Sequence, residues 1–546
     1  MKRKAVAAVL TAVMVASMFT GCGSDNGSSS AKSASAASAA SAANDTVDED
    51  GKVNGIMYQE GLPLVDEGDY TFSIFCDDSS ESGEFIMLDE FKKQTNVDVD
   101  LKIYPYETAT ERLNLDLNSG DYADVIGGWT LSDNAILTYG VNQGVFIPLE
   151  DYFEKYCPNI SAILDLPGVR EKMTAPDGHI YTIPYVCTDT TVGYSPYINT
   201  KWLENVGMSM PTTTDEFEAV LKAFKEQDAN GNGDASDEIP FSTDPNNKHI
   251  EAMAGYFGLP MNKPGIAIQN EKVVYGGVSD TYREFLSWFH KLYAEGLVDV
   301  ELYTQDSSTW EGKGNQDLYG VSIAYGSNEF TGIPAAEERG DFDSMPVLNT
   351  DKDGIWLRDT EGFSVYRTQA VITNKAEHPE IICRWFDNAF ALENGIGCNR
   401  GPVGVIVNKE DDGYHAIDTT TLSEEDQEKY SWGNLWPQSL PKYLPVDFEF
   451  VEEHPMYDEK KATEEAYEAN LTKEIIPSYW IDLDKIDTFS DTNTAIKDFF
   501  EQQQAQFVCG ELDIDNDADW QAYVDGMYSL GLEDWVATQG IEEIAK

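Results

Sequence analysis

The sequence predicts an α/β protein with more than one domain. At 546 residues the chain is long for a single hydrophobic core, and two or three domains are expected. Beyond a Ser/Ala-rich N-terminal stretch, segments that alternate apolar and polar residues are followed by segments with helical spacing of apolar residues. Such alternation of strand and helix indicates a largely parallel sheet with helices on its faces.

The N-terminus has the features of an export signal. Three basic residues at positions 2–4 precede an apolar run over 5–19, which is too short and too rich in alanine to span a membrane. The run leads into Phe-Thr-Gly-Cys, which resembles the bacterial lipobox with Phe19 in place of the usual leucine. We therefore predict a signal peptide at residues 1–21, cleaved before a lipidated Cys22. Ordinary secretion with a chance cysteine is the alternative.

The segment that follows Cys22 consists almost wholly of Ser, Ala and Gly up to residue 43. It cannot bury enough apolar surface to fold, so we predict a tether, which we extend over residues 22–65. Acyl chains on Cys22 would hold the protein stably at a membrane. The prediction is a globular protein anchored by lipid to the extracellular face of the cell membrane.

The first globular region carries a β-α-β-α-β pattern. Strands are expected at 70–76, 97–103 and 123–129, with helices at 83–95 and 109–120 between them. Ligands of such sheets bind beyond the carboxyl ends of the strands, so the loops after Cys76 and Ile126 are of interest. Later helices are expected at 213–225, 279–297, 378–393, 491–508 and 517–540.

A loop rich in oxygen atoms follows the helix expected at 213–225. Counted from Asp228, oxygen-bearing side chains fall at positions one, three and five and a glycine at position six, as in the first half of an EF-hand loop: Asp228, Asn230, Asn232 and Gly233. Asp234 at position seven would offer its backbone carbonyl. Position twelve is Ile239, and the acids Asp237 and Glu238 come earlier. The pattern favours a structural Ca²⁺ site; a solvated turn without an ion is the alternative.

Charge and cysteine content exclude some classes of protein. The 97 acidic and 37 basic residues give a net charge of −60, which argues against binding of nucleic acid. Six cysteines follow Cys22 and none forms a CxxC pair, so small buried thiols are expected. The spacing leaves open a disulfide between Cys383 and Cys398.

The segment 198–241 (INTKWLENVGMSMPTTTDEFEAVLKAFKEQDANGNGDASDEIPF) resembles the hallmark segment of the family 1 extracellular solute-binding proteins, the capture subunits of carbohydrate ABC importers. Other segments match in the family's order: LNSGDYADVI, GVFIPLEDYFEKYCPNI, PDGHIYTIPYV, KLYAEGLVD, HPEIICRWFDNAF and GELD…WQAYVDGMYSLGLEDW. Similar members include alginate-type oligosaccharide binders, which hold Ca²⁺ at this loop. The resemblance implies the following ligands here: Asp228, Asn230, Asn232, Asp234, Asp237 and Glu238.

The resemblance also implies a two-lobe periplasmic-binding-protein fold, type II-like, with a hinge and a ligand cleft between the lobes. We place the N-terminal lobe at residues 66–190 plus 366–400 and the C-terminal lobe at residues 191–365 plus 401–546. The chain would then cross between the lobes near 185–194, 364–369 and 397–404.

A sugar presents apolar C–H faces and a rim of hydroxyl groups, so it needs flat aromatic rings and planar polar side chains. Residues of these kinds near strand ends, crossings and Gly/Pro-marked loops are the candidate ligand contacts: Asp77, Asp78, Trp129, Tyr185, Tyr194, Trp310, Tyr325, Trp356, Arg400, Trp432 and Trp436. Similar reasoning applies to Tyr197, Phe330 and Arg358. The alternatives are helix capping for the aspartates, core packing for the aromatic residues and structural salt bridges for the arginines.

We therefore predict a lipid-anchored monomer that captures an oligosaccharide and delivers it to the transmembrane subunits of an ABC importer. A peptide or pheromone receptor, or a sensor, of the same fold is the alternative. A surface glycoside hydrolase is a weaker one, because the sequence has no G-x-S-x-G, H-E-x-x-H or G-x-x-x-x-G-K-[ST] motif and carboxylate pairs are uninformative among so many acids. We expect no enzymatic activity.

Overall fold

The computed structural model describes residues 45–78, 84–244, 249–332, 341–417, 419–445, 448, 450–451 and 455–545. Cys22, the predicted signal peptide and the Ser/Ala-rich part of the predicted tether lie outside the described residues. The rest of the chain forms two lobes, each of mixed α/β content and each with its own hydrophobic core.

The central sheet of the first lobe has five strands in the order β4-β3-β5-β14-β6. They are β3 (Tyr70–Asp77), β4 (Val97–Tyr104), β5 (Val125–Gly127), β6 (Thr182–Thr188) and β14 (Phe363–Ile372). β3 is parallel to β4 and β5, whereas β14 is antiparallel to β5 and β6. Helices α1 (Ile86–Thr95) and α2 (Tyr106–Ser119) connect the first three strands, so the predicted β-α-β-α-β unit is confirmed.

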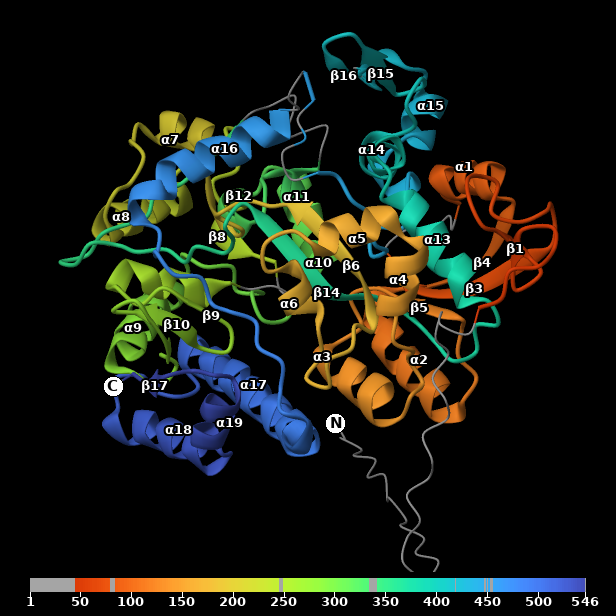
Figure 1. Ribbon diagram of the computed structural model, residues 1–546. Coiled ribbons are helices and arrows are strands. Elements are labelled where there is room, and N and C mark those ends of the chain that lie inside the picture. The colour runs from red at the N-terminus through yellow and green to blue at the C-terminus, as the bar shows by residue number, and fades with distance from the viewer. Residues whose placement is uncertain are drawn as a thin grey trace, which may run out of the picture. The chain divides into compact units, whose positions relative to one another are not determined.

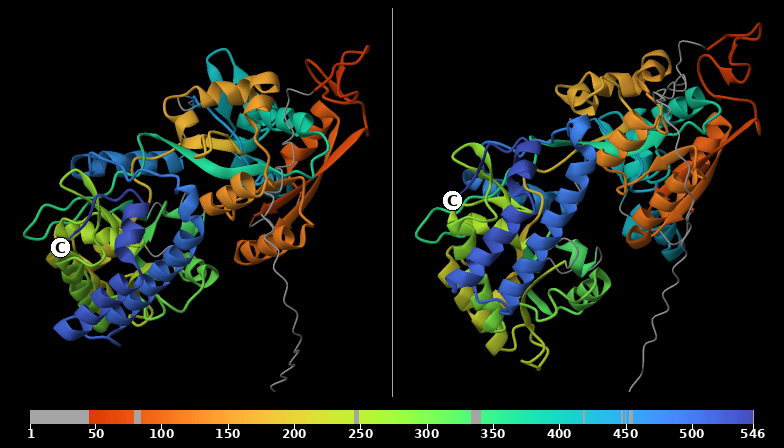
Figure 2. Two further views of the ribbon diagram at one scale, coloured as in Figure 1. Left: turned by 60° about the horizontal axis from the view of Figure 1, so that its bottom comes forward. Right: turned by 90° about the horizontal axis from the view of Figure 1, so that it is seen from below.

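Further helices lie in the first lobe. They are α3 (Asp133–Ala135), a π-helical turn at Ile136–Asn142, α4 (Glu150–Tyr156), α5 (Pro158–Leu164), α6 (Val169–Met173), α13 (Pro379–Ala389) and α14 (Leu392–Arg400). Among them, α4, α5, α6, α13 and α14 contribute to the core of this lobe. Figures 1 and 2 show the segment around α13 and α14, drawn in cyan, beside the red and orange N-terminal strands. The first lobe therefore combines two stretches of chain that are distant in sequence.

The N-terminal boundary of the first lobe lies earlier than the sequence analysis placed it. Val53 in β1 (Lys52–Val53), Met57 in β2 (Met57–Tyr58) and Leu64 are buried in the core of this lobe. Residues 52–65 are therefore part of the fold rather than of a tether. Their apolar residues are irregularly spaced, which gives no strand or helix period to read from sequence.

The C-terminal boundary of the first lobe lies later than expected. Trp436 stacks on Trp385 of α13 with 5.7 Å between ring centroids, and Leu440 belongs to the same core. The chain returns to the second lobe after Tyr443, which packs against this core, and not near 397–404. The intervening residues include the hairpin β15 (Val407–Glu410) and β16 (Gly413–Ala416), helix α15 (Glu424–Lys429) and a 3-10 turn at Trp432–Asn434.

The second lobe contains two four-stranded sheets, in the orders β13-β7-β12-β8 and β17-β11-β10-β9. The strands are β7 (Ser195–Asn199), β8 (Ile239–Thr243), β9 (Met261–Asn262), β10 (Ile266–Gln269), β11 (Lys272–Tyr275), β12 (Tyr319–Ala324), β13 (Phe342–Ser344) and β17 (Glu543–Ile544). The helices are α7 (Thr200–Val206), α8 (Thr214–Glu226), α9 (Asp280–Ala294), α10 (Ser307–Asn315), α11 (Asn328–Thr331), α16 (Pro455–Tyr467), α17 (Ile486–Cys509), α18 (Asp517–Ser529) and α19 (Leu532–Thr538), with a 3-10 helix at Ile250–Phe257.

Helices α8, α9 and α17 confirm the sequence predictions, whereas the helix expected over 517–540 is two helices. Gly531 separates α18 from α19 with a φ of 89°, a left-handed conformation that suits glycine. Figure 1 shows α17, α18 and α19 together beside α9. Tyr282 of α9 and Phe500 of α17 stack there with 5.5 Å between centroids.

Two of the segments that cross between the lobes run side by side. The backbone N–H of Asp189 donates to the carbonyl of Gly362 at 3.1 Å, and that of Asp359 donates to Thr191 at 2.9 Å. A side-chain bond joins them as well, because the N–H of Gly193 donates to the Asp359 carboxylate at 2.6 Å. The two crossings at residues 189–194 and 359–366 are thus tied into one unit.

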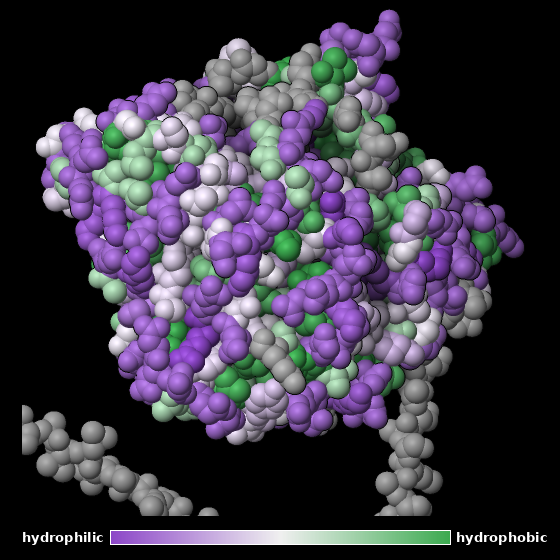
Figure 3. Space-filling model, turned by 90° about the vertical axis from the view of Figure 1, so that its left-hand side faces the viewer, coloured by the Kyte–Doolittle hydropathy of each residue, from purple (hydrophilic) through white to green (hydrophobic). Residues whose placement is uncertain are grey.

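The surface of the second lobe is largely polar, in keeping with the strong negative charge of the chain. Hydrophilic residues cover most of the face drawn in Figure 3. None of the helices in the described ranges is long and apolar enough to cross a membrane. The six cysteines after Cys22 are free thiols, and four of them are buried, as expected from sequence.

Candidate functional site

Aromatic side chains from both lobes meet at the crossings. Trp129, which follows β5, lies with its ring centroid 5.3 Å from Tyr366 of β14 and 6.4 Å from Tyr185 of β6. Tyr185 and Tyr366 stack at 5.5 Å. In the second lobe the ring of Tyr194, just before β7, lies 6.0 Å from that of Tyr325, just after β12. We call these five residues the junction cluster.

One carboxylate links the two halves of the junction cluster. Asp189 accepts hydrogen bonds from the hydroxyls of Tyr325 at 3.1 Å and Tyr366 at 3.3 Å. It also accepts from the Ser364 hydroxyl at 2.6 Å and from the backbone N–H of Thr190 at 2.8 Å. Since Asp189 directly follows β6, the hydroxyl groups of both lobes converge on the first crossing segment.

Trp129 is held at the end of β5 by the buried carboxylate of Asp77, the last residue of β3. Asp77 accepts from the backbone N–H of Trp129 at 3.0 Å and of Thr130 at 2.6 Å. A Cβ on Gly128 would lie 2.4 Å from this carboxylate, and the φ of Gly128 is 134°, so the turn requires glycine. Neighbouring strand ends of the parallel part of the sheet thus present an indole that is 45% exposed.

A second exposed indole lies beside the cluster. Trp432, which is 53% exposed, has the ammonium of Lys442 5.5 Å from its ring centroid, and the same ammonium lies 5.9 Å from the ring of Tyr185. The backbone N–H of Gln438 donates to Asp78 at 2.7 Å, which fixes this loop to the end of β3. Two large platforms, Trp129 and Trp432, therefore flank the tyrosines.

Burial perturbs the ionisable groups around the cluster. It raises the pKa of Asp77 and of Glu329 and lowers the pKa of both Lys442 and Lys460 to about 8. Burial also lowers the pKa of His249 to about 4, and this ring stacks on Tyr194 with 3.9 Å between centroids. His249 is therefore neutral at pH 7.

Three predicted contact residues are buried away from this cluster. Trp310, Trp356 and Trp436 are at most 2% exposed and pack in hydrophobic cores, and the indole N–H of Trp310 donates to Ser322 at 3.2 Å. The structure therefore contradicts the predicted ligand role of these three indoles, which pack in the hydrophobic cores instead. Tyr197 and Phe330 lie together in one of these cores.

The arginines weighed as ligand contacts are held by the protein. Arg358 donates to the Thr472 carbonyl at 3.2 Å and to Glu468 at 3.3 Å. Arg400 is half-buried with its guanidinium 5.9 Å from the Phe450 ring centroid, and burial lowers its pKa to about 10. Structural contacts therefore account for both positions.

The oxygen-rich loop after α8 folds on itself. Thr213 caps α8 by accepting from the N–H of Glu216 at 3.2 Å, and Glu216 accepts in return from Thr212 at 2.8 Å. Within the loop, Asp228 accepts from the N–H of Gly233 at 3.0 Å. The side-chain amides of Asn230 and Asn232 donate to Asp237 at 3.3 and 2.7 Å, so hydrogen bonds join three side chains of the predicted set.

Two carboxylate oxygens of this loop are buried without a hydrogen-bond partner, Oδ1 of Asp228 and Oε2 of Glu238. Burial, with the nearby charge of Asp237, raises the pKa of Glu238. Buried anionic oxygens without donors are costly unless a cation compensates them. The donor set, all oxygen and rich in carboxylate, fits a hard cation such as Ca²⁺.

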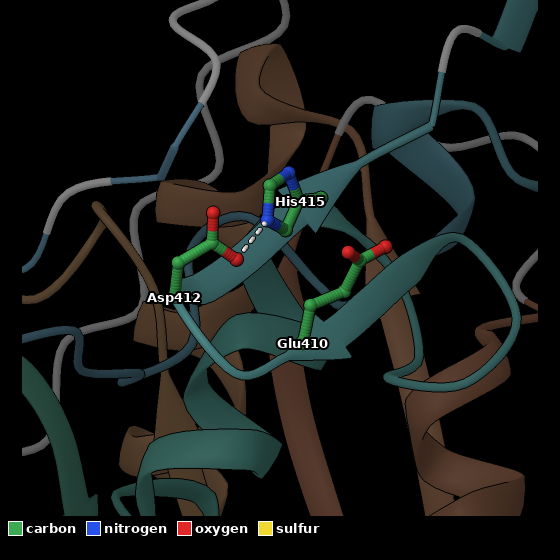
Figure 4. A group of neighbouring side chains, drawn as sticks. All are labelled: Glu410, Asp412 and His415. Atoms are coloured by element: carbon green, nitrogen blue, oxygen red, sulfur yellow. Dashed lines mark hydrogen bonds and ion pairs between the residues drawn. The ribbon is translucent and has the colours of Figure 1, made fainter.

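One further group of potential metal ligands lies on the hairpin β15–β16. The ligand atoms of Glu410, Asp412 and His415 lie within 4.8 Å of one another. Figure 4 shows the three side chains on this hairpin. His415 and Asp412 are joined at 3.0 Å, and both acids are exposed. An exposed ion pair accounts for this grouping, so we assign no metal there.

Comparison with known proteins identifies the family of this chain. The family described as bacterial extracellular solute-binding protein matches residues 78–395, more than half of the chain. The chain belongs to this family. This solute-binding protein is also 31% identical over 411 residues to the fructooligosaccharide ABC transporter substrate-binding protein FusA of Streptococcus pneumoniae serotype 4, covering 73% of this chain and 70% of FusA.

Solved structures agree with the sequence relation. The solute-binding protein matches S. pneumoniae FusA in complex with kestose with a TM-score of 0.76 and 26% identity, over 86% of this chain and 98% of FusA. It matches a FusA EF-hand mutant in complex with fructo-nystose with a TM-score of 0.73, 27% identity and the same coverage. These relatives confirm the two-lobe α/β fold and the homology to carbohydrate importer subunits.

Two relatives from Bacillus subtilis are more distant. Lipoprotein LipO is 28% identical over 280 residues, which is 50% of this chain and 52% of LipO. The polygalacturonan/rhamnogalacturonan-binding protein YtcQ is 23% identical over 239 residues, covering 43% of this chain and 46% of YtcQ. The relatives of this solute-binding protein thus include binders of neutral and of acidic glycans.

Four residues beside the predicted contacts were missed from sequence: Asp189, His249, Tyr366 and Lys442. Tyr366 could have been found, since it lies within the crossing expected at 364–369, and Asp189 lies within the one at 185–194. His249 and Lys442 carry no sequence signal, because their neighbours in the site come from other parts of the chain.

Proposed function

We propose that this solute-binding protein captures an oligosaccharide at the junction cluster and delivers it to an ABC importer without altering it. The observation that carries the proposal is the convergence of partly exposed aromatic rings from both lobes on hydroxyl and carboxylate groups at the crossings. Rings of this kind stack on the C–H faces of sugars, and the polar groups bind sugar hydroxyls. The carbohydrate-binding relative FusA supports the same conclusion.

The proposal assigns the platform roles to Trp129 and Trp432, the two large exposed indoles beside the tyrosines. Tyr185, Tyr194, Tyr325 and Tyr366 would form the floor, with Asp189 beside them. Asp77, predicted from sequence as a sugar contact, is buried and bonded to backbone N–H groups, so it positions Trp129 instead. Closure of the lobes around the sugar would complete the site, as in two-lobe binding proteins generally.

Isothermal titration calorimetry against a panel of oligosaccharides tests the proposal. Kestose, the ligand of FusA, belongs in the panel together with galactans, xylans and oligogalacturonates. We expect a 1:1 complex with at least one glycan and a matching rise in melting temperature. The bound sugar should be recovered intact after prolonged incubation, because members of this family are binding proteins.

Substitution of Trp129 by Ala should weaken binding about 30-fold, since a large aromatic platform is lost. Tyr528→Ala is the matched control, because Tyr528 lies in α18 and is similarly exposed at 41%. Equal affinity of the Trp129→Ala variant and the wild-type protein would contradict the assignment. Binding of peptides, but of no glycan, would contradict the function itself.

The proposal includes a structural Ca²⁺ ion in the loop after α8. Asp228 and Glu238 would supply carboxylate oxygens, Asn230, Asn232 and Asp237 side-chain oxygens, and Asp234 its backbone carbonyl. The two unpartnered oxygens support it, and so does the EF-hand of FusA. Removal of calcium with a chelator should lower the melting temperature, and calcium but not magnesium should restore it; no change would leave the loop as a plain turn.

The proposal also includes a lipid anchor at Cys22, which places the protein on the extracellular face of the membrane beside its permease. The lipobox-like sequence supports it, and LipO is a lipoprotein. The Cys22→Ser substitution should release the protein from the membrane fraction into the medium. The purified variant should bind sugar with the same affinity as the wild-type protein. Retention of the variant on membranes would contradict the anchor.

A further inference from the structure

The electrostatic surroundings of the junction cluster are predominantly negative. Asp77 and Asp78 end β3 beside Trp129 and the Gln438 loop, and both are at most 3% exposed. Asp189 lies among the tyrosines. Glu329 accepts from the backbone N–H of Tyr325 at 2.9 Å, and the charge of Glu329 acts on Tyr194. Four carboxylates therefore surround the aromatic platforms.

Two cations face the cluster, and neither ammonium is presented to a ligand. Lys442 is 2% exposed and donates to the side-chain carbonyl of Gln438 at 2.6 Å. Lys460 is 7% exposed, donates to the carbonyl of Gly193 at 2.7 Å and lies 3.7 Å from the ring centroid of Tyr325. Each lysine is bonded to a neutral oxygen and packed against an aromatic face, so both act inside the protein.

Arg358 and Arg367 are engaged away from the junction cluster, whereas Arg400 lies close enough to Lys442 for its charge to help lower the pKa of that lysine. Besides the contacts of Arg358 and Arg400 described above, Arg367 pairs with Asp133 at 2.8 Å and donates to the Tyr479 carbonyl at 2.9 Å. A carboxylate on a ligand is normally bound by a paired arginine or by a lysine that can reach it. The described residues around the junction cluster place neither in that role.

We propose that the site selects neutral oligosaccharides and excludes those that carry uronic acids, and that Asp189 is the residue responsible for most of this selection. The inference rests on the proposed function and narrows its substrate class. A ligand carboxylate beside the tyrosines would meet the charge of Asp189, and the two nearby ammonium groups are already bonded to protein oxygens. Juxtaposed like charges at an interface suppress the wrong partner. The relatives leave the question open, because YtcQ is a polygalacturonan/rhamnogalacturonan-binding protein and FusA is a fructooligosaccharide-binding one.

Asp189 has this role because of its position. It lies between the hydroxyls of Tyr325 and Tyr366, one from each half of the cluster, on the crossing segment itself. Neutral sugar hydroxyls can donate to its carboxylate, whereas a ligand carboxylate has no proton to donate. The residue thus favours one class of ligand and repels the other through the same oxygen atoms.

A matched pair of ligands tests the inference. The tightest neutral glycan from the calorimetric panel is oxidised at a primary alcohol to its uronate, so that the pair differs only in that group. We expect the uronate to bind about 100-fold more weakly at 50 mM NaCl, with a smaller difference at 500 mM NaCl because salt screens the repulsion. Equal or tighter binding of the uronate overturns the inference.

The Asp189→Asn variant keeps the shape of the side chain and removes its charge. We expect it to reduce the discrimination between the two ligands by about tenfold, whereas Asp534→Asn, an exposed aspartate of α19, leaves it unchanged. Unchanged discrimination in a folded Asp189→Asn protein overturns the role of Asp189. If that variant does not fold, the wild-type protein provides the test. A ratio of uronate to neutral dissociation constants that is the same at 50 and 500 mM NaCl overturns the electrostatic basis of the selection.

The outcomes also separate this inference from the proposed function. If the panel yields only uronate-bearing ligands, the inference fails and oligosaccharide capture stands. If no glycan of either kind binds, both fail together.

Discussion

The junction cluster and the oxygen-rich loop are built in opposite ways. The loop takes all its candidate ligands from eleven consecutive residues, 228–238, directly after one helix. The cluster takes its residues from segments that lie far apart in sequence, from Trp129 to Tyr366. The arrangement of the loop therefore depends on local sequence, whereas the cluster forms only once both lobes have folded. This difference predicts that the loop governs stability and the cluster governs affinity.

The largest expected effect is loss of the ion from the loop. The double variant Asp228→Asn, Glu238→Gln should lose about 4 kcal/mol of stability when calcium is a thousandfold above its dissociation constant, because the wild-type protein alone gains from binding. Chemical denaturation with and without calcium measures it. Below the melting temperature of the variant, the variant and the calcium-loaded wild-type protein should bind sugar with the same affinity. A much weaker affinity in the variant would contradict the prediction that the loop governs stability alone.

A buried carboxylate outside both regions provides a reference. Asp387 of α13 accepts from the N–H of Ile160 at 2.8 Å and from the Asn159 amide at 3.0 Å, and burial raises its pKa to about 6 from an ordinary 3.8. The Asp387 carboxyl group thus binds its proton more tightly in the folded state than in the unfolded state. Stability contributed by Asp387 is present at low pH and is lost as the pH rises from 4 to 6.

Comparison of the wild-type protein with Asp387→Asn isolates this contribution. Between pH 4 and pH 7 the wild-type protein should lose up to about 3 kcal/mol relative to the variant, since each unit of pKa shift corresponds to about 1.4 kcal/mol. Denaturant unfolding at both pH values measures the difference. A constant difference would show that the folded and unfolded proteins titrate alike at this residue. Sugar affinity at pH 7 should not change.

The smallest effect is expected for one hydroxyl of the cluster. Tyr366→Phe keeps the ring that packs on Trp129 and removes a hydroxyl of the proposed sugar site. Loss of one hydrogen bond to a bound sugar is worth about 1 kcal/mol, or about fivefold in affinity. The melting temperature should stay within about 2 °C, because the ring packing is retained. Calorimetry and thermal unfolding on the same sample check both. A fall in stability without a fall in affinity would place Tyr366 in the scaffold rather than in the site.

Sequence reasoning succeeded where the information is local. The strands at 70–76 and 97–103, helix α8 with its Thr213 cap and the order of oxygen ligands in the loop all follow from short-range periodicity or spacing. It also marked Trp129, Tyr185, Tyr194, Tyr325 and Trp432 near the crossings, and the structure brings these together. Whether they bind a sugar is the proposal that the calorimetric panel tests.

Sequence reasoning failed where the information is tertiary. Trp310, Trp356 and Trp436 stand in loop-like or irregular sequence, yet each finds a core that only the folded chain provides. The family resemblance placed the third crossing near 397–404, whereas the stack of Trp436 on Trp385 keeps that stretch in the first lobe. Residues 52–65 joined the fold through a few apolar side chains without any period. None of these pairings leaves a trace in local spacing.

Strand β14 carries Tyr366 and Arg367 as consecutive residues, whose side chains leave opposite faces of the sheet. On one face Tyr366 belongs to the junction cluster. On the other face Arg367 donates hydrogen bonds to Asp133 of α3 and to the Tyr479 carbonyl, and its guanidinium lies 4.1 Å from the Trp480 ring centroid. The two residues share one peptide unit, so a displacement of the strand at Tyr366 would also displace the ion pair between Arg367 and Asp133.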